Sequence, residues 1–237
     1  MEKGFYNKKL PKIGLVEHAN QKRLRIGLVT DSITGTTDHE TRQTVEATAK
    51  RLADLGHHVD IFKLPIDPQF VTDFSIYWGM LSFMVSSLGK QAFGKSFDKH
   101  RLDHLTVGLS QLYKKNFLQT PFTLYRLNKA KHEYIQIFQQ YDAFISPVLA
   151  HTTPQLGHLS PELPFETLFE RLQNYVTFTP FHNIVGAPAI SLPAGQSKAG
   201  LPIGIQISAN IGDERTLLEL AYELEQAQPW HNIQNSE

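Results

Sequence analysis

Residues 24–62, LRIGLVTDSITGTTDHETRQTVEATAKRLADLGHHVDIF, decide the fold class because they predict a strand, a helix and a second strand in close succession. The first strand is the mostly apolar run Leu24–Val29, and the second is His57–Phe62. A strand-helix-strand unit favours two parallel strands joined by a right-handed crossover. Apolar residues recur between the strands at helical spacing, at Val45, Ala49, Leu52 and Leu55.

Residues typical of helix termini stand at both ends of this expected helix. Thr37, followed three residues later by Glu40, matches a capping box, in which two side chains bond each other's backbone N–H groups. Gly56 stands where a C-terminal cap needs a residue with positive φ. The helix is therefore expected between Thr37 and Gly56.

The middle of the chain has few β-branched runs and predicts mainly helices. We expect three long helices near Val71–Leu88, Asp98–Leu118 and Phe122–Gln140. A buried strand is expected at Tyr141–Val148, and a short helix near Phe165–Gln173.

The last third predicts a hairpin and a final helix. Ala189–Pro193 and Ile203–Ser208 have strand character and are separated by a glycine-bearing turn. Asp213 is expected to cap the helix that follows. Together these patterns predict an α/β fold with a parallel strand pair near its start and a hairpin near its end.

The distribution of polar and turn-forming residues along the chain suggests one domain with two short extensions. Residues 1–22 are predicted to form an irregular arm, residues 23–230 the domain and residues 231–237 a polar tail.

Composition narrows the classes of function. Lys+Arg and Asp+Glu number 23 each among the 237 residues, so the net charge is zero and no nucleic-acid partner is expected. The chain has no cysteine, which excludes disulfides and thiolate chemistry. No signal peptide and no apolar run of about 20 residues are found, so we expect a cytoplasmic protein without membrane contact.

Gly89–Ser96, GKQAFGKS, matches the phosphate-binding P-loop pattern. In that alternative, Lys95 would neutralise a phosphate and Ser96 would hold magnesium. A P-loop follows a strand, however, and the residues before Gly89 favour a helix. A turn between surface helices is the preferred interpretation.

Other candidate sites are weaker. His100 and His104 are four residues apart, a spacing that zinc sites use on a helix, but a third ligand cannot be assigned and surface histidines are favoured. No G-x-S-x-G nucleophile pattern occurs, and Ser86–Ser87 lies in an expected helix. We therefore expect no metal and no cofactor.

Two segments of the last third carry a family resemblance. Residues 178–195, FTPFHNIVGAPAISLPAG, and residues 200–207, GLPIGIQI, closely resemble the amidase signature family. Leu24–Gly27 and Tyr141–Pro147 resemble earlier segments of the same family in the same order. The similarity extends from about residue 22 to residue 230.

The resemblance implies an α/β/α fold around a mixed sheet and hydrolysis of a carboxamide C–N bond to a carboxylate and ammonia or an amine. Family members use a Ser nucleophile, a bridging Ser in a cis peptide and a Lys. The physical reason is that an amide is a poor electrophile, so the attacking hydroxyl must be activated by a nearby base.

The family's Gly/Ser-rich loop and its Lys lie upstream of the matched region, and nothing in Met1–Arg25 resembles them. The chain therefore resembles the carboxyl-terminal half of an amidase, and no catalytic residue is assigned in it. We expect it to be inactive without a separate half that carries Ser, Ser and Lys. It would contribute part of the pocket for a small amide substrate.

Within the matched segment, Thr179 and Asn183 are the candidate substrate-binding residues. The structural alternative is that Asn183 bonds to backbone while Gly186 and Pro188 shape a turn. A non-catalytic binding or assembly module derived from an amidase is the alternative function. Because half of a domain exposes surface that the other half should cover, self-association is expected when the chain is alone.

Overall fold

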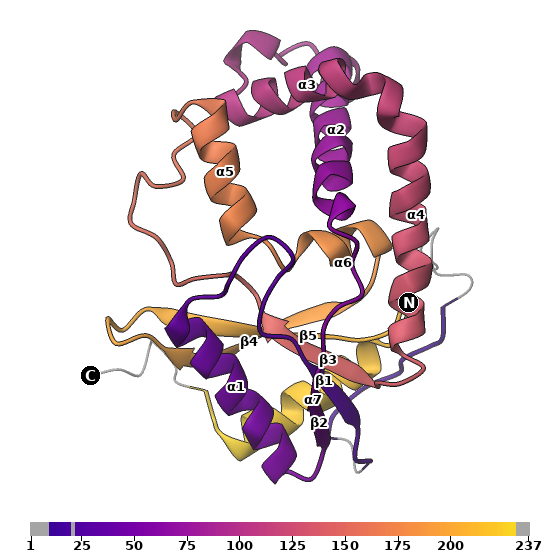
Figure 1. The fold of residues 1–237 in the computed structure, drawn as a ribbon, viewed down its shortest axis with the longest axis vertical. Helices are drawn as coiled ribbons and strands as arrows, with labels where there is room; N and C mark the ends of the chain where they lie inside the picture. Colours follow the sequence, from indigo (N-terminus) through magenta and orange to yellow (C-terminus); the bar gives the residue numbers. More distant parts are fainter. Residues whose placement is uncertain (1–9, 20–21, 231–237) are drawn as a thin grey trace.

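The computed structural model describes residues 10–19 and 22–230, and its centre is a five-stranded sheet of order β2-β1-β3-β5-β4 (Figure 1). The strands are β1 (Arg25–Leu28), β2 (His58–Ile61), β3 (Ala143–Pro147), β4 (Ala189–Gln196) and β5 (Pro202–Ser208). β1 runs parallel to β2 and β3, whereas β5 is antiparallel to β3 and β4. The predicted mixed sheet, its parallel βαβ unit and its C-terminal hairpin are confirmed.

Helices cover both faces of this sheet. α1 and α7 lie on one face, and α2, α4 and α6 lie on the other (Figure 1). The helices are α1 (His39–Asp54), α2 (Gln69–Phe93), α3 (His104–Asn116), α4 (Thr120–Ile137), α5 (Phe165–Tyr175), α6 (Pro180–Val185) and α7 (Glu214–Ala227). The predicted α/β class is therefore confirmed, with the layers helix, sheet, helix.

Strand β3 joins two hydrophobic clusters. All five of its residues are buried. Ala143 and Ile145 face the cluster with α1 and α7, and Phe144 faces the cluster with α4 and α6. This alternation follows from the two-residue period of a strand.

Helix α2 is the longest element, with 25 residues, and at 1.5 Å per residue it is about 38 Å long. It extends away from the sheet and carries α3 at its far end (Figure 1). Gly79 allows the two helices to approach closely, because a Cβ there would lie 2.7 Å from the backbone oxygen of Leu109. α3 also packs on α5, where a Cβ on Gly108 would overlap the ring of Phe165.

The capping box predicted for α1 is wrong. Asp38 is the N-cap: its carboxylate accepts a hydrogen bond from Thr41 N at 2.9 Å and another from Thr152 N at 2.9 Å. The Thr37 hydroxyl instead donates to Thr30 O. A carboxylate that accepts hydrogen bonds from the N–H groups of two separate segments stabilises the start of α1 better than the Thr37 hydroxyl could. Gly56 follows the helix with φ +97°, as predicted.

Three other helix expectations need correction. The helix predicted over Asp98–Leu118 begins only at His104, where Asp103 accepts from Thr106 N, and Asp98 caps a separate short 3₁₀ turn. α2 continues five residues past the predicted end at Leu88. Helix α6 was not predicted, because the flanking proline and glycine suggested a turn into β4.

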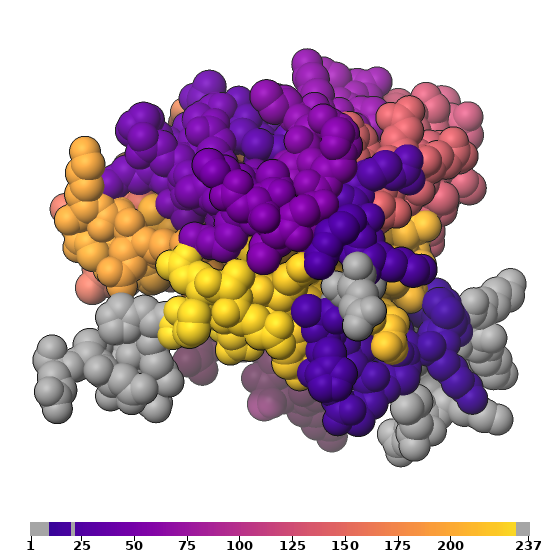
Figure 2. All heavy atoms as spheres, turned by 90° about the horizontal axis from the view of Figure 1, so that it is seen from below, coloured from indigo at the N-terminus to yellow at the C-terminus, as the bar shows by residue number. Residues whose placement is uncertain are grey.

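The extensions are only partly within the described residues. Residues 1–9, 20–21 and 231–237, which include half of the predicted arm and the whole predicted tail, lie outside them. Residues 10–19 contain no helix or strand and lie beside α7 (Figure 2), where Arg215 donates to Ile13 O at 2.8 Å. Among the described residues, no helix is both long and apolar enough to cross a membrane.

The contact at Gly79 gives a stability prediction. Gly79→Ala should lower the free energy of unfolding by about 1–2 kcal/mol, because the overlap with Leu109 outweighs the better helix propensity of alanine. Urea unfolding followed by circular dichroism measures this change. Gly35→Ala is the control, since no heavy atom lies within 4 Å of the added Cβ. An equal or higher stability of Gly79→Ala would contradict the close approach.

Candidate functional site

The connections of the sheet create a natural place for a ligand. β1 lies between β2 and β3, so the chain leaves it on one side to form β2 and returns on its other side to form β3. In open α/β sheets, ligands bind at the carboxyl ends of strands at such a switch point. The loop after β1, residues 29–38, forms one wall of a pocket there.

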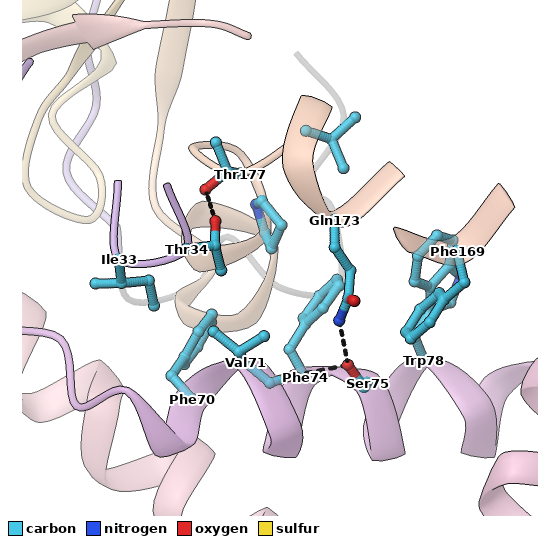
Figure 3. A pocket seen from close by; sticks show the side chains of 12 residues that line it. Ile33, Thr34, Phe70, Val71, Phe74, Ser75, Trp78, Phe169, Gln173 and Thr177 are labelled. Atoms are coloured by element: carbon cyan, nitrogen blue, oxygen red, sulfur yellow. Dashed lines mark hydrogen bonds between the residues drawn. The ribbon is translucent and has the colours of Figure 1, made fainter. Parts of the chain in front are cut away.

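This pocket lies between α2, α5, the residues joining α5 to α6, and the loop after β1 (Figure 3). Its cavity volume is about 40 Å³, room for a few water molecules. The lining residues are Ile33, Thr34, Phe70, Val71, Phe74, Ser75, Trp78, Phe169, Gln173, Val176, Thr177 and Pro180.

Aromatic rings form one continuous side of the pocket. Phe70, Phe74 and Trp78 are four residues apart and therefore lie on one face of α2 (Figure 3). Their ring centroids are separated by 6.1 Å and 5.9 Å, and Phe169 of α5 lies 6.3 Å from Trp78. These distances are within the range of favourable aromatic pairs.

Two hydrogen-bonded pairs supply the polar groups. The hydroxyls of Thr34 and Thr177 bond to each other and join the β1 loop to the segment after α5. Gln173 Nε2 donates to Ser75 Oγ at 3.3 Å, and Ser75 Oγ donates to Val71 O at 2.7 Å (Figure 3). No charged residue lines the pocket.

The two residues proposed from the sequence lie at the edge of this region. Thr179 is half-buried at the start of α6, between the lining residues Thr177 and Pro180, and its hydroxyl donates to Val176 O at 3.4 Å. Asn183 is exposed one turn later on α6. Neither side chain is part of the pocket lining. Gly186 ends α6 with φ +67°, which agrees with the expected turn.

A buried histidine anchors α6 to the sheet. His182 Nε2 lies 2.7 Å from the hydroxyl of Ser208 on β5, and its Nδ1 lies 3.4 Å from Gln206 Nε2. Burial lowers the pKa of His182 to about 4, although a hydrogen bond to the Phe178 backbone partly opposes the shift. His182 is therefore neutral near pH 7.

A serine beside a histidine is also the arrangement of an activated nucleophile. Here Ser208 is 0% exposed and His182 is 7% exposed, and neither lines the pocket. A substrate cannot reach this hydroxyl, so the pair serves to position α6 and the residues before it.

The weaker sequence candidates do not form sites. Gly89 lies inside α2, which runs to Phe93, so no strand precedes the P-loop pattern and the preferred turn begins only at Gly94. Ser86 also lies in α2 and donates to Ser82 O. His100 and His104 belong to different helical segments. Among the described residues, no group of three or more His, Cys, Asp or Glu could hold a metal.

Sequence reasoning missed the pocket residues. The four-residue spacing of Phe70, Phe74 and Trp78 is visible in the sequence, but it was not connected to a site, and Phe70 lies outside the helix predicted over Val71–Leu88. No local signal pointed to Gln173 and Phe169, because they meet α2 from a segment about 90 residues away.

The amidase family model matches residues 9–218. A putative amidase AmiC from Mycobacterium leprae is 40% identical over 98% of this chain and 50% of the relative. The chain thus spans about half the length of the curated relatives it matches.

Solved structures give the same picture of the fold. A 6-aminohexanoate cyclic dimer hydrolase complexed with substrate is 25% identical with a TM-score of 0.75, covering 89% of this chain and 46% of that one. A bacterial aryl acylamidase of the amidase signature family is 18% identical with a TM-score of 0.66, covering 88% and 44%. The second likeness concerns the fold alone.

The anchor of α6 gives a pH prediction. Because the pKa of His182 falls from 6.5 to about 4 on folding, its neutral form stabilises the fold above pH 6.5, and this contribution is lost as the pH falls toward 4. The loss should reach about 3 kcal/mol, at 1.36 kcal/mol per unit of pKa.

Urea unfolding of the wild type and of His182→Gln, which does not titrate, isolates this effect. The stability advantage of the wild type should shrink between pH 6.5 and pH 4. His132→Gln, at an exposed position of α4, is the matched control and should show no such trend. An advantage that stays constant with pH would show that burial of His182 does not control its protonation.

Proposed function

The chain belongs to the amidase family, and on that premise we propose that it forms the carboxyl-terminal part of an enzyme that hydrolyses a carboxamide. The observation that carries the proposal is the pocket beside the loop after β1, within the segment that matches the family. The substrate-binding wall is thus assigned to this chain.

The catalytic groups are proposed to come from outside this sequence. In the reaction, a Ser hydroxyl oxygen bonds to the carbonyl carbon, and its proton passes through a second Ser to a neutral Lys. The C–N bond then breaks, and the nitrogen leaves with a proton as ammonia or an amine. Water hydrolyses the acyl-Ser to a carboxylate and frees the Ser hydroxyl.

Thr179 and Asn183 are proposed to contact the substrate. Thr179 follows the lining residue Thr177 by two positions, and α6 holds Asn183 on the outside of the helix. His182, between them in the sequence, fixes α6 on β5 and so limits where these two side chains can go.

The sheet edge at β4 is the proposed meeting place with the Ser/Ser/Lys segment. Within the described part of the chain, β4 pairs only with β5, and five of its eight residues are exposed. An edge of this kind is a template for pairing with another strand. The bulge between Pro193 and Gly195 interrupts it without covering it.

The test of the proposal is purification of the tagged chain from its natural host, with the co-purifying polypeptides identified by mass spectrometry. A Ser/Ser/Lys-bearing segment should accompany the chain, or be encoded immediately upstream of Met1 in one of the three frames. The assembled protein should release ammonia from simple amides and be monodisperse. The chain alone should release none and should self-associate.

Two results would contradict this. Ammonia release by the chain alone, abolished by a point change within it, would place the catalysis here. An assembly that hydrolyses no amide would favour a binding or assembly module instead.

Substrate contact by Thr179 and Asn183 is tested in the assembled enzyme. Thr179→Val and Asn183→Ala should each reduce kcat/KM about threefold to tenfold, because a net hydrogen bond contributes roughly 0.5–1.5 kcal/mol. Asn174→Ala is the matched control, at an exposed position of α5 outside the pocket lining, and should leave kcat/KM unchanged. Unchanged kinetics in both test variants would assign Thr179 and Asn183 a purely structural role.

A further inference from the structure

We propose that a surface cavity between α2 and α3, at the end of α2 that lies away from the sheet, binds the phosphoryl group of a small phosphate compound (Figure 1). The volume of this α2–α3 cavity is about 340 Å³, within the roughly 300–1,000 Å³ typical of small-molecule sites. The site is separate from the pocket of Figure 3 and from the proposed amide hydrolysis. Three features support it: the turn that builds one wall, the charge of the lining and a buried hydroxyl without a partner.

The turn after α2 builds one wall of the cavity. α2 ends one residue before Gly94, whose φ of +91° lets the chain change direction. The ring of Phe97 then packs against α2, where a Cβ on Gly89 would lie 2.3 Å from it. This close contact returns the chain to α2 and brings Lys99 and His100 to the cavity. The stretch that matches the P-loop pattern therefore positions two basic side chains rather than a phosphate-binding loop.

The lining of the cavity is basic. Lys99, His100 and Lys114 belong to it, and no acidic residue does. Neither lysine forms an ion pair with another residue in the described part of the chain. Lys114 Nζ lies 5.7 Å from the centroid of the Phe83 ring, a cation–π contact that holds the ammonium near α2 without using its N–H groups in hydrogen bonds. Asp98, just outside the lining, already accepts a hydrogen bond from His100 N at 2.9 Å. Positive charge without a carboxylate in the lining favours an anion.

A buried hydroxyl without a partner lies in the same wall. Ser110 lines the cavity from α3 and is only 2% exposed. Among the described residues, its Oγ is the one fully buried side-chain nitrogen or oxygen that makes no hydrogen bond. Buried polar groups are normally hydrogen-bonded, so an unpaired hydroxyl in the wall of a cavity indicates a ligand atom as its partner. The other hydroxyl of the lining, that of Ser86, already donates to Ser82 O at 2.8 Å.

The groups available to a ligand are mainly hydrogen-bond donors. The two ammonium groups, the Ser110 hydroxyl and the amide nitrogen of the exposed Gln111 can all donate. A phosphoryl group matches them because it offers three strong acceptor oxygens and close to two negative charges. The lining also includes Leu102 and Val107, against which the organic part of a phosphomonoester can lie.

Isothermal titration calorimetry of the full chain tests the site with phenyl phosphate, inorganic phosphate, acetate and phenol at constant ionic strength. Both phosphates should bind saturably and about tenfold more tightly than acetate, because they carry more charge and one more acceptor oxygen. Phenol should not bind. Tighter binding of phenyl phosphate than of inorganic phosphate identifies a phosphomonoester as the ligand, and equal binding identifies the free ion.

Two variants locate the binding. Ser110→Ala should weaken the binding of inorganic phosphate about tenfold, the loss expected for one hydrogen bond to a charged group. Lys114→Gln should weaken it about threefold and reduce its dependence on salt, because the charge of an exposed lysine contributes less and is screened. Lys115→Gln, at the exposed neighbouring position outside the lining, is the matched control and should leave binding unchanged. Lys114→Gln keeps the test decisive if Ser110→Ala fails to fold, as judged by circular dichroism.

Three results would overturn the proposal. They are no saturable binding of either phosphate, acetate binding as tightly as phosphate, and phosphate binding that neither Ser110→Ala nor Lys114→Gln weakens. The last result would show that phosphate binds elsewhere on the molecule. None of these measurements involves an amide, so their outcome is independent of the proposed hydrolytic function.

Discussion

Strand β3 has to bury both of its faces, because a hydrophobic cluster lies on each side of the sheet. It also pairs with β1 in parallel and with β5 in antiparallel orientation, so it connects the βαβ unit to the C-terminal hairpin. The rest of the molecule depends on this position. The contact of His182 with Ser208 on β5, the strand beside β3, determines where α6 lies.

Much of the fold could be predicted because its strands are defined by local composition. Leu24–Val29 and Ile203–Ser208 are recognisable as strands whatever surrounds them. The helix ends were harder, because contacts between distant segments decide them. Asp38 is a better cap than Thr37 partly because it also binds Thr152 N, 114 residues away, and no local pattern contains that bond.

The candidate site was predictable only in part, for a similar reason. Family resemblance indicated the segment around Thr179 and Asn183, and the structure places that segment next to a pocket. The pocket itself needs Gln173 and Phe169 to meet α2, which only the packed fold brings about. Sequence spacing can show that Phe70, Phe74 and Trp78 share a helix face, but not what faces them.

The length of α2 separates two parts of the molecule. Its first turns pack on the sheet through Phe70, while its far end packs on α3, away from the sheet (Figure 1). Phe74 and Trp78 lie between these two ends, whereas Phe70 belongs to the buried cluster on the sheet. The half-buried rings of Phe74 and Trp78 can therefore change in the course of evolution while the buried residues that hold the five strands together stay the same.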